Sequence, residues 1–404
     1  MSKIITDAKQ VEEVLTRGVE NIYPDKASLK KELLSGRRLR LYCGFDPTAA
    51  TLHIGNGIQI RKLEQFRRLG HEVVFLFGGY TALIGDPSGK SQARRALTEE
   101  EIKANMRDWK KQIENIIDIK DITFKNNSDW LGKLSFADIL KLTSYFTAQQ
   151  MIAREMFQKR LKEGNDLYVN EFLYPVMQAY DSVAMDVDLE IGGNDQMFNM
   201  LAGRTLMKKM KNKEKFVLTT KLLEDPTGKK MGKSEGNMIT LTDDPADMYG
   251  KIMSWPDTMI TTAMEIITNI PLAEIKEAEK EMKNGVNPRD YKMKLAYEVV
   301  RIYLGHDAAR HGQNEFTRVF QEKQKPTEIP VALISDKDGQ IGVLDLFVQA
   351  GLAKSNSEVK RLIKERAIRI DDEIIINDVQ MVKIPKAGLL LQRGKKQFAQ
   401  AKLK

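Results

Sequence analysis

The stretch Leu41–Asn56, LYCGFDPTAATLHIGN, contains the most informative local pattern in the chain. Apolar residues occupy alternate positions from Leu39 to Phe45, and a period of two is typical of a β-strand with two distinct faces. Asp46-Pro47-Thr48 ends this strand, and His53 precedes a helix. A strand that turns into a helix presents free backbone N–H groups and the positive end of the helix dipole. Both features favour a bound phosphate.

The residues that follow extend this unit. Apolar residues recur at helical spacing between Ile60 and Leu69, and Gly70 can end the helix. Glu72–Phe77 is an almost continuous apolar run, as expected of a buried parallel strand. The order strand, helix, strand predicts an α/β fold with a Rossmann-like parallel sheet.

The composition excludes several classes of protein. With 404 residues, 42% hydrophobic and 30% charged, we expect a soluble protein of two to three domains. No apolar run reaches the ~18 residues of a membrane span, and the N-terminal residues do not resemble a secretory signal. Cys43 is the only cysteine and there are four histidines, so we expect no disulfide, no protein-bound metal and a reducing cytoplasm.

The net charge of +8 is concentrated near the C-terminus. Residues 341–404 contain 13 Lys and Arg against 7 Asp and Glu. Such an excess predicts a polyanionic partner, although a solvated charged surface is the alternative interpretation. Within this part, helical spacing predicts one helix from Val343 and a second, basic helix after Ser355. Short β-rich runs follow them.

A glycine-rich loop, GGYTALIGDPSGKS, follows the strand Glu72–Phe77. A phosphate-binding loop of the Walker A type requires glycine five residues before Gly89-Lys90, and Ile84 stands there. The spacing therefore excludes that class of nucleotide site. What remains is a glycine-rich loop at the carboxyl end of a strand, where open α/β sheets bind ligands.

Three further segments carry polar groups in suggestive positions. In the helix predicted over Tyr168–Asp181, the residues Tyr174, Gln178 and Asp181 share one face, which suits a pocket wall. Leu189–Gln196, LEIGGNDQ, predicts a second strand that turns into a helix. Lys221–Ser234 is rich in lysine and glycine, which predicts a cationic loop.

These segments together resemble the motifs of class I aminoacyl-tRNA synthetases, and specifically those of the tyrosyl-tRNA synthetases. The matching motifs are CGFDPTA (43–49), HIGN (53–56), GDPSGK (85–90), GGNDQ (192–196) and KMGKS (230–234). Asn56 and Gly232 depart from the usual family residues, which are histidine and serine. The departures leave open how much Asn56 contributes and how stiff the lysine loop is.

The resemblance implies a role for each matching residue. For catalysis and ATP binding it implies Thr48, His53, Gly55, Asn56, Gly193, Asp195, Lys230 and Lys233. For tyrosine it implies Tyr42, Asp46, Asp86, Tyr174, Gln178, Asp181 and Gln196, with Tyr42 and Asp181 suited to the two halves of a phenol. For pyrophosphate it implies Lys90 and Arg94. Mg²⁺ is expected to arrive with ATP and not in a protein cage.

The resemblance also implies the domain organisation and the partners. We expect a catalytic domain at 1–243, with an insert at about 99–165 that carries a homodimer contact and a loop at 230–234. A helical domain for the anticodon arm (244–325) and a linker (326–340) follow. Residues 341–404 resemble the RNA-binding domain named after a ribosomal small-subunit protein. They are expected to contact tRNA(Tyr) through Lys354, Lys360, Arg361, Lys364 and Arg366.

Two other functions stay open at this point. One is a related enzyme, either a tryptophanyl synthetase or a simpler nucleotidyltransferase, against which Tyr42 and Asp181 argue because an indole has no hydroxyl. The other is a non-catalytic RNA-binding regulator built on the same body. Such a regulator is expected to have lost His53 or Lys233, and both are present.

Removal of the basic C-terminal part tests the RNA-binding hypothesis. A chain that ends near Gln340 should keep adenylate formation and lose most tRNA charging, because phosphate contacts supply much of the affinity for nucleic acid. Charging by the full chain should also weaken as salt is raised. Equal charging by the shortened and full chains would show that residues 341–404 do not bind the tRNA.

Overall fold

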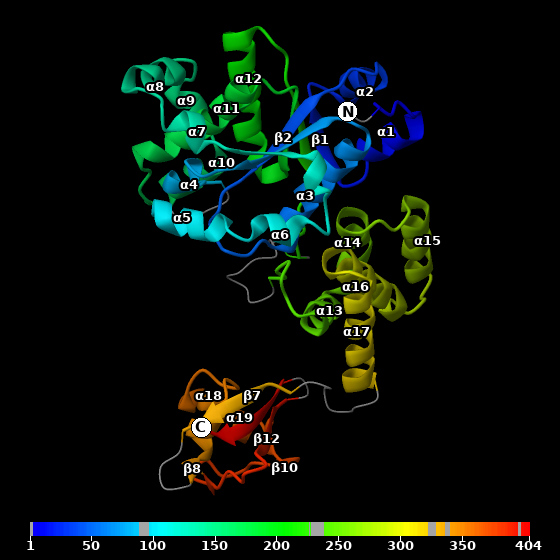
Figure 1. The fold of residues 1–404 in the computed structure, drawn as a ribbon, viewed down its shortest axis with the longest axis vertical. Helices are drawn as coiled ribbons and strands as arrows, with labels where there is room; N and C mark the ends of the chain where they lie inside the picture. The colour runs from blue at the N-terminus through cyan, green and yellow to red at the C-terminus, as the bar shows by residue number, and fades with distance from the viewer. Residues whose placement is uncertain are drawn as a thin grey trace. The chain divides into compact units, whose positions relative to one another are not determined.

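The computed structural model describes residues 3–88, 97–225, 227, 238–321, 329–335, 340–394 and 397–404. The chain forms two compact units, Met1–Gly312 and Gln313–Lys404, and each contains its own β-sheet (Figure 1). No helix within the described ranges is both long and apolar enough to cross a lipid bilayer.

A six-stranded sheet organises the first unit, in the order β1-β6-β5-β2-β3-β4. Its strands are β1 (Val19–Tyr23), β2 (Arg40–Phe45), β3 (Glu72–Phe77), β4 (Thr123–Asn126), β5 (Leu189–Gly193) and β6 (Phe216–Thr220). All neighbours are parallel except β1, which pairs antiparallel with β6 at the edge. The predicted α/β fold with a Rossmann-like parallel sheet is confirmed.

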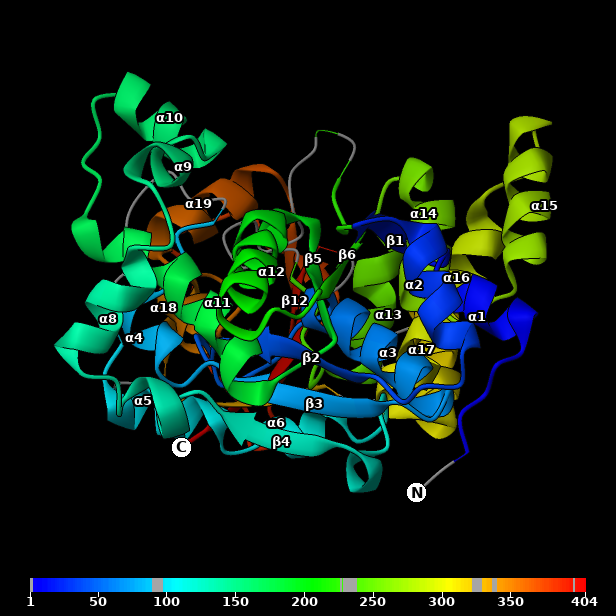
Figure 2. The same ribbon diagram turned by 90° about the horizontal axis from the view of Figure 1, so that it is seen from above.

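The direction of the strand order reverses between β2 and β5. From β2 the chain continues outward to β3 and β4, and from β5 it continues the opposite way to β6. Right-handed crossover connections therefore place α3 (Ile54–Arg68) and α12 (Met197–Lys211) on opposite faces of the sheet (Figure 2). Ligands of open α/β sheets bind at such a reversal, beyond the carboxyl ends of the strands.

Helices cover this sheet and form the rest of the unit. Before β5 they are α1 (Ala8–Val14), α2 (Lys26–Leu34), α3, α4 (Thr81–Ile84), α5 (Glu99–Met106), α6 (Trp109–Ile113), α7 (Ser128–Leu131), α8 (Phe136–Thr143), α9 (Ala148–Ile152), α10 (Glu155–Lys162) and α11 (Leu173–Met185). After β6 they are α13 (Pro245–Met253), α14 (Ile260–Ile267), α15 (Leu272–Lys283), α16 (Arg289–Leu304) and α17 (His306–Phe316). Side-chain caps such as Thr98, Ser135 and Thr147 begin several of them, because these side chains accept from free N–H groups of the first turn.

Two buried basic side chains hold α3 in place. Lys62 Nζ donates to the backbone oxygens of Val14 at 2.8 Å and Arg17 at 2.7 Å. Arg61 Nη2 donates to the backbone oxygen of Thr268 at 2.6 Å. Burial, together with the neighbouring charges of Arg17 and Arg61, lowers the pKa of Lys62 to about 7. These bonds replace the lost hydration of the two side chains. Lys62 ties α3 to the end of α1, and Arg61 ties it to the helical segment after β6.

Two strands of this sheet lie in segments where the sequence analysis predicts no strand. β1 lies within residues 1–37, and β4 lies within the insert predicted at about 99–165. β1 and β4 are the two edge strands of the sheet, and most of their residues are only half-buried. A half-buried strand of four or five residues has too little apolar alternation to be recognised. The insert therefore extends the catalytic sheet as well as connecting its halves.

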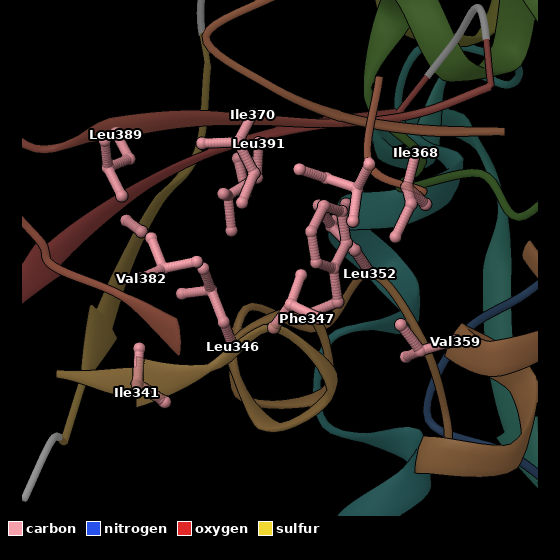
Figure 3. Close-up of a cluster of buried hydrophobic side chains, with 14 of the residues drawn as sticks. Ile341, Leu346, Phe347, Leu352, Val359, Ile368, Ile370, Val382, Leu389 and Leu391 are labelled. Carbon is pink, nitrogen blue, oxygen red and sulfur yellow. The ribbon is translucent and has the colours of Figure 1, made fainter. Parts of the chain in front are cut away.

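The second unit is a small α+β structure. Its main sheet has the order β10-β9-β12-β13-β7, and β11 pairs with β8. The elements are β7 (Val331–Ile334), β8 (Ile341–Gly342), α18 (Val343–Gln349), α19 (Asn356–Lys364), β9 (Ile368–Ile370), β10 (Glu373–Ile374), β11 (Met381–Val382), β12 (Leu389–Arg393) and β13 (Gln397–Leu403). Phe347 of α18 lies among aliphatic side chains such as Leu391 in its core (Figure 3).

The linker predicted at 326–340 is partly wrong. β7 lies inside that range, pairs parallel with β13, and places Ile334 in the core of the second unit with no exposed surface. The surrounding charged and proline residues mask this strand in the sequence, because its pairing partner is about 70 residues away. A truncation that leaves the second unit out should therefore end before Val331 and not at Gln340.

Candidate active site

A cavity of about 310 Å³ opens at the strand reversal, beyond the carboxyl ends of β2 and β5. It brings together every predicted substrate residue that the structure describes in the first unit. These are Tyr42, Asp46, Thr48, His53, Gly55, Asn56, Asp86, Tyr174, Gln178, Asp181, Gly193, Asp195 and Gln196. They come from four separate segments of the chain (42–56, 86, 174–181 and 193–196), so a shared cavity is a result of the fold and not of sequence proximity.

His53 is the N-terminal cap of α3. The backbone N–H of Asn56 donates to His53 Nδ1 at 3.4 Å, and the backbone N–H of His53 donates to Asn56 Oδ1 at 3.1 Å. Gly55 leaves room for this arrangement, because a Cβ there would lie 2.9 Å from two atoms of the imidazole ring. Asn56 therefore contributes the second half of a capping box.

The imidazole of His53 faces the cavity as a hydrogen-bond donor. Burial lowers the pKa of His53, so the ring is neutral near pH 7. Because Nδ1 accepts from the backbone, this hydrogen-bonding pattern assigns the proton to Nε2. A neutral N–H at a helix N-terminus suits a phosphate oxygen.

Asp46 is held by two hydroxyl groups at the end of β2. Tyr174 Oη donates to its Oδ2 at 2.8 Å, and Thr81 Oγ1 donates to its Oδ1 at 2.7 Å. Gly78 allows the close approach, since a Cβ there would lie 2.0 Å from Asp46 Oδ1. Burial raises the pKa of Tyr174, and the charge of Asp46 raises it further, so Tyr174 stays protonated as the donor.

Asp86 and Gln196 form a second polar contact on the cavity wall. Gln196 Nε2 donates to Asp86 Oδ2 at 2.6 Å, and the backbone N–H of Ser88 donates to Asp86 Oδ1 at 2.9 Å. Asn199 Nδ2 donates in turn to Gln196 Oε1 at 3.0 Å. The bond from Asn199 fixes which way the Gln196 amide points.

Gln178 presents an acceptor to the cavity. Its Nε2 donates to Glu190 Oε1 at 3.0 Å, which leaves its Oε1 as the free end of the amide. That oxygen is buried and has no hydrogen-bond partner among the described residues. An unpaired buried acceptor is costly, and a ligand N–H would satisfy it.

The deepest part of the cavity is lined by Asp181 and Tyr42, which are only 2% and 1% exposed. Trp130 Nε1 donates to Asp181 Oδ1 at 2.8 Å, and Asn127 Nδ2 donates to Asp181 Oδ2 at 3.2 Å. Burial raises the pKa of Asp181 well above its usual range, and these two hydrogen bonds oppose that rise. The Tyr42 hydroxyl lies 3.0 Å from Ser182 Oγ. Burial also raises the pKa of Tyr42, so the phenol stays protonated.

Several residues of this site were not predicted from the sequence. They are Gln59, Thr81, Asn127, Trp130, Ser182, Glu190 and Lys215. Glu190 gave one usable signal, because a carboxylate within an apolar strand requires a partner. Asn127 and Trp130 gave none, since they follow β4, which the pattern of the insert did not reveal.

The other predicted site residues are either outside the described residues or in the second unit. Lys90, Arg94, Lys230 and Lys233 are outside the described residues. In the second unit, Lys354, Lys360, Arg361, Lys364 and Arg366 are all exposed, while Val359, Leu362 and Ile363 on the other side of α19 are buried. Arg361 also pairs with Glu365 at 3.0 Å, and both side chains are exposed.

Comparison with known proteins gives consistent results. A family profile described as class I tRNA synthetases (W and Y) matches residues 34–321. A tyrosine–tRNA ligase of Carboxydothermus hydrogenoformans is 42% identical over 98% of both chains. A tyrosine–tRNA ligase of Thermotoga maritima is 41% identical over 98% of this chain and 97% of its own. These similarities extend over both units.

Solved structures are similar over most of the chain. A truncated mitochondrial tyrosyl-tRNA synthetase of Coccidioides posadasii has a TM-score of 0.62 at 25% identity, covering 76% of this chain and 91% of its own. The corresponding protein of Aspergillus nidulans has a TM-score of 0.64 at 24% identity, covering 77% and 94%. At 24% identity, the similarity to the Aspergillus nidulans protein shows a shared fold.

The cap at the start of α3 can be tested by substitution. Asn56→Ala removes the acceptor for the His53 backbone N–H and should lower the free energy of unfolding by about 1 kcal/mol, the usual effect of losing a helix cap. Denaturant titration measures this change. Asn56→Asp keeps an oxygen at the same position and serves as the control. If both variants are as stable as the parent protein, Asn56 does not cap the helix.

Proposed function

This chain belongs to the class I tRNA synthetases for tryptophan and tyrosine. From that premise we propose which residues bind each part of the substrates and which stabilise the reacting phosphate. The protein is a tyrosine–tRNA ligase, which activates tyrosine with ATP to tyrosyl-adenylate and transfers the tyrosyl group to the 3′ end of tRNA(Tyr). The observation that supports our assignment is the single cavity at the strand reversal, with all the described substrate residues on its wall.

In the first step, a carboxylate oxygen of tyrosine attacks the α-phosphate of ATP and pyrophosphate leaves. Charge develops on phosphate oxygens, so the reaction needs alignment and hydrogen-bond or cationic stabilisation more than covalent help. We assign this stabilisation to Thr48, His53, Lys230 and Lys233. His53 contributes as a neutral Nε2–H donor, in keeping with its lowered pKa. Lys90 and Arg94 are assigned to the leaving pyrophosphate.

Different groups are assigned to the adenosine and to the α-amino end of tyrosine. Gly193 and Asp195 at the end of β5 are assigned to the ribose; a Cβ on Gly193 would lie 2.6 Å from Asp195 Oδ1. Gln178 Oε1, Tyr174 and Asp86 are assigned to the ammonium group of tyrosine. The unpartnered acceptor on Gln178 supports this assignment, because an ammonium group supplies only donors. Gln196 is assigned to the tyrosine carboxylate.

Tyr42 and Asp181 are assigned to the phenol of tyrosine. Each carboxylate oxygen of Asp181 accepts one protein hydrogen bond and keeps room for a second donor. Phenylalanine in the same position would leave the remaining acceptor capacity of Asp181 and a donor of Tyr42 unsatisfied in a buried place, which is costly. Tryptophan has no hydroxyl to offer them, so the same pair favours tyrosine over tryptophan.

The remaining partners follow from the reaction. ATP is the energy-supplying substrate of this family, and we propose that Mg²⁺ enters with its phosphates, because Mg²⁺ prefers phosphate and water oxygens. We propose that the exposed basic face of α19 contacts the phosphates of tRNA, and that helices α13–α17 form the domain for the anticodon arm. The buried free thiol of Cys43 is consistent with a cytoplasmic location.

We further propose that the protein is a homodimer that associates through the second half of the insert and the residues just after it. Residues 136–169 hold a group of exposed large apolar side chains: Phe136, Leu140, Ile152, Leu161, Tyr168 and Val169. Phe136 is 73% and Val169 is 80% exposed. Phe136 and Leu140 are four residues apart on α8 and share one face. Large exposed apolar side chains mark an interface. In a symmetric dimer, the same surface of a second copy of the chain covers them.

The recognition of the phenol predicts how two substitutions change amino-acid selection. Tyr42→Phe should lower kcat/KM for tyrosine more than for phenylalanine, so the ratio of the two kcat/KM values should fall. Asp181→Ala should lower this tyrosine/phenylalanine ratio further because it removes the acceptor. One unpaired buried polar group costs about 1–3 kcal/mol, so the ratio should fall by roughly 5- to 150-fold. ATP–pyrophosphate exchange with each amino acid gives both values.

Tyr180→Phe is the matched control for this experiment. Tyr180 precedes Asp181 on α11 but does not line the cavity, so its hydroxyl should not matter to the ratio. An unchanged ratio in both cavity variants would mean that the hydroxyl of tyrosine is recognised elsewhere. Exchange that depends on a different amino acid would contradict the function itself.

The proposed dimer predicts a change in mass in solution. Phe136→Asp combined with Leu140→Asp places two charges on the apolar face of α8 and should convert a dimer into a monomer of 46.0 kDa. Sedimentation equilibrium measures the mass. Val379→Asp, at a side chain that is 77% exposed in the second unit, is the control and should leave the dimer intact. A double variant that stays dimeric would exclude this surface.

A further inference from the structure

Beneath the phenol end of the cavity, a buried lysine joins three polar side chains into one network. Lys215 Nζ donates to Ser182 Oγ at 2.9 Å and forms an ion pair with Glu190 Oε2. Ser182 Oγ lies 3.0 Å from the Tyr42 hydroxyl and 3.4 Å from Glu190 Oε2. Gln178 Nε2 donates to the other oxygen of Glu190 at 3.0 Å. The network thus reaches both the phenol end and the amino end of the site.

All four central side chains are shielded from water. Lys215 and Ser182 have no exposed surface, Tyr42 is 1% exposed and Glu190 is 2% exposed. Burial lowers the pKa of Lys215, while the charge of Glu190 raises it. A buried ion pair is often no more stabilising than apolar side chains of the same size. Stability alone therefore does not account for a lysine at this position.

Helix α12 leaves space for Lys215 at Gly203. Gly203 lies inside α12, where glycine is less favourable than alanine by about 1 kcal/mol. A Cβ at Gly203 would lie 2.5 Å from Lys215 Nζ and 2.9 Å from Ser182 Oγ. The backbone of α12 does not require glycine here, because its φ is not in the left-handed region. The glycine therefore serves the network.

The number of donors and acceptors on each side chain decides which group donates in each hydrogen bond of the network. Lys215 has only donors, so Ser182 Oγ must accept from it and keeps one proton to give. The nearer acceptor for that proton is the Tyr42 oxygen, at 3.0 Å against 3.4 Å for Glu190. Tyr42 then keeps its own proton, for which Glu190 beside it and a ligand hydroxyl in the cavity are the acceptors. A ligand hydroxyl there accepts from Tyr42 and donates to Asp181.

The same ion pair orients the amide at the other end. An ionised Glu190 can only accept, so it binds the N–H side of Gln178 and turns the Gln178 oxygen toward the cavity. A protonated Glu190 could donate instead and would allow the amide to rotate. The ion pair with Lys215 balances the charge of Glu190 in this buried place.

We propose that Lys215, through Glu190 and Ser182, is a positioning residue that sets the hydrogen-bond direction at both ends of the amino-acid site. It does not touch the substrate. It makes Tyr42 a donor to the phenol and Gln178 an acceptor for the ammonium group. This inference rests on the function proposed above and deepens it, because it names what selects tyrosine in this chain.

Lys215→Met keeps the length of the side chain and removes the charge. In this variant Glu190 loses the buried cation that holds it, so its contact with Gln178 is no longer fixed, and the KM for tyrosine in ATP–pyrophosphate exchange should rise by ~10-fold or more, with a smaller change in kcat. Ser182 is released to accept from Tyr42, so the ratio of kcat/KM for tyrosine over phenylalanine should also fall by ~10-fold or more.

A double variant separates positioning from a general loss of structure. Lys215→Met with Glu190→Gln removes both charges, and the new amide oxygen can again accept from Gln178. The KM for tyrosine should return close to that of the parent protein, while the tyrosine/phenylalanine ratio stays low because Ser182 still lacks its donor. Failure of the double variant to restore KM would overturn the role of Glu190 in orienting Gln178.

Two further variants complete the test. Lys213→Met removes a lysine two residues away that pairs with the exposed Asp186 and the buried Asp188, and it should change neither KM nor the ratio. If Lys215→Met does not fold, Gly203→Ala displaces Lys215 Nζ without removing it and should lower the ratio in the same direction. Parent values of KM and of the ratio in Lys215→Met would overturn the inference. Absence of tyrosine-dependent exchange in the parent protein would instead overturn the proposed function.

Discussion

Asp181 and Glu190, two carboxylates buried beneath the amino-acid cavity, impose the constraint on which the rest of the site depends. A carboxylate removed from water is costly unless donors or cations replace its hydration. Trp130 and Asn127 supply donors to Asp181, and Gln178 and Lys215 supply them to Glu190. These four partners come from the insert, from α11 and from the start of β6. The sheet, the insert and the helix must therefore all be in place before the cavity can exist.

The position of the cavity follows from the strand order. β2 and β5 are neighbours whose connections leave in opposite directions, so their carboxyl ends are left open between the two sets of helices. His53 caps α3 at this opening, and the buried bonds of Lys62 and Arg61 hold the body of the same helix. A helix fixed along its length presents its N-terminal N–H groups at a defined place, which electrostatic stabilisation of a reacting phosphate requires.

The elements that could be predicted from the sequence are those with a complete local pattern. The strand Glu72–Phe77 is nearly all apolar, and α3 shows helical spacing with a cap at His53, so each is recognisable without knowledge of its neighbours. β1, β4 and β7 were missed for the opposite reason. Each has four or five residues, lies at the edge of a sheet, and is stabilised by pairing with a strand distant in the sequence.

The sequence by itself determined the parallel-sheet architecture, and it predicted the substrate residues, because motif residues such as His53 and Asp195 are recognisable from their immediate neighbours. The pairing of His53 with Asn56 was not predicted, although the two residues lie within one helical turn. Only the tertiary structure decided what surrounds Asp181 and Glu190. Lys215 lies 33 residues from Ser182 in the chain, and Tyr42 lies 140 residues from it. The direction of a hydrogen bond among such groups depends on burial and on the count of nearby donors, and these properties arise only when distant segments pack together.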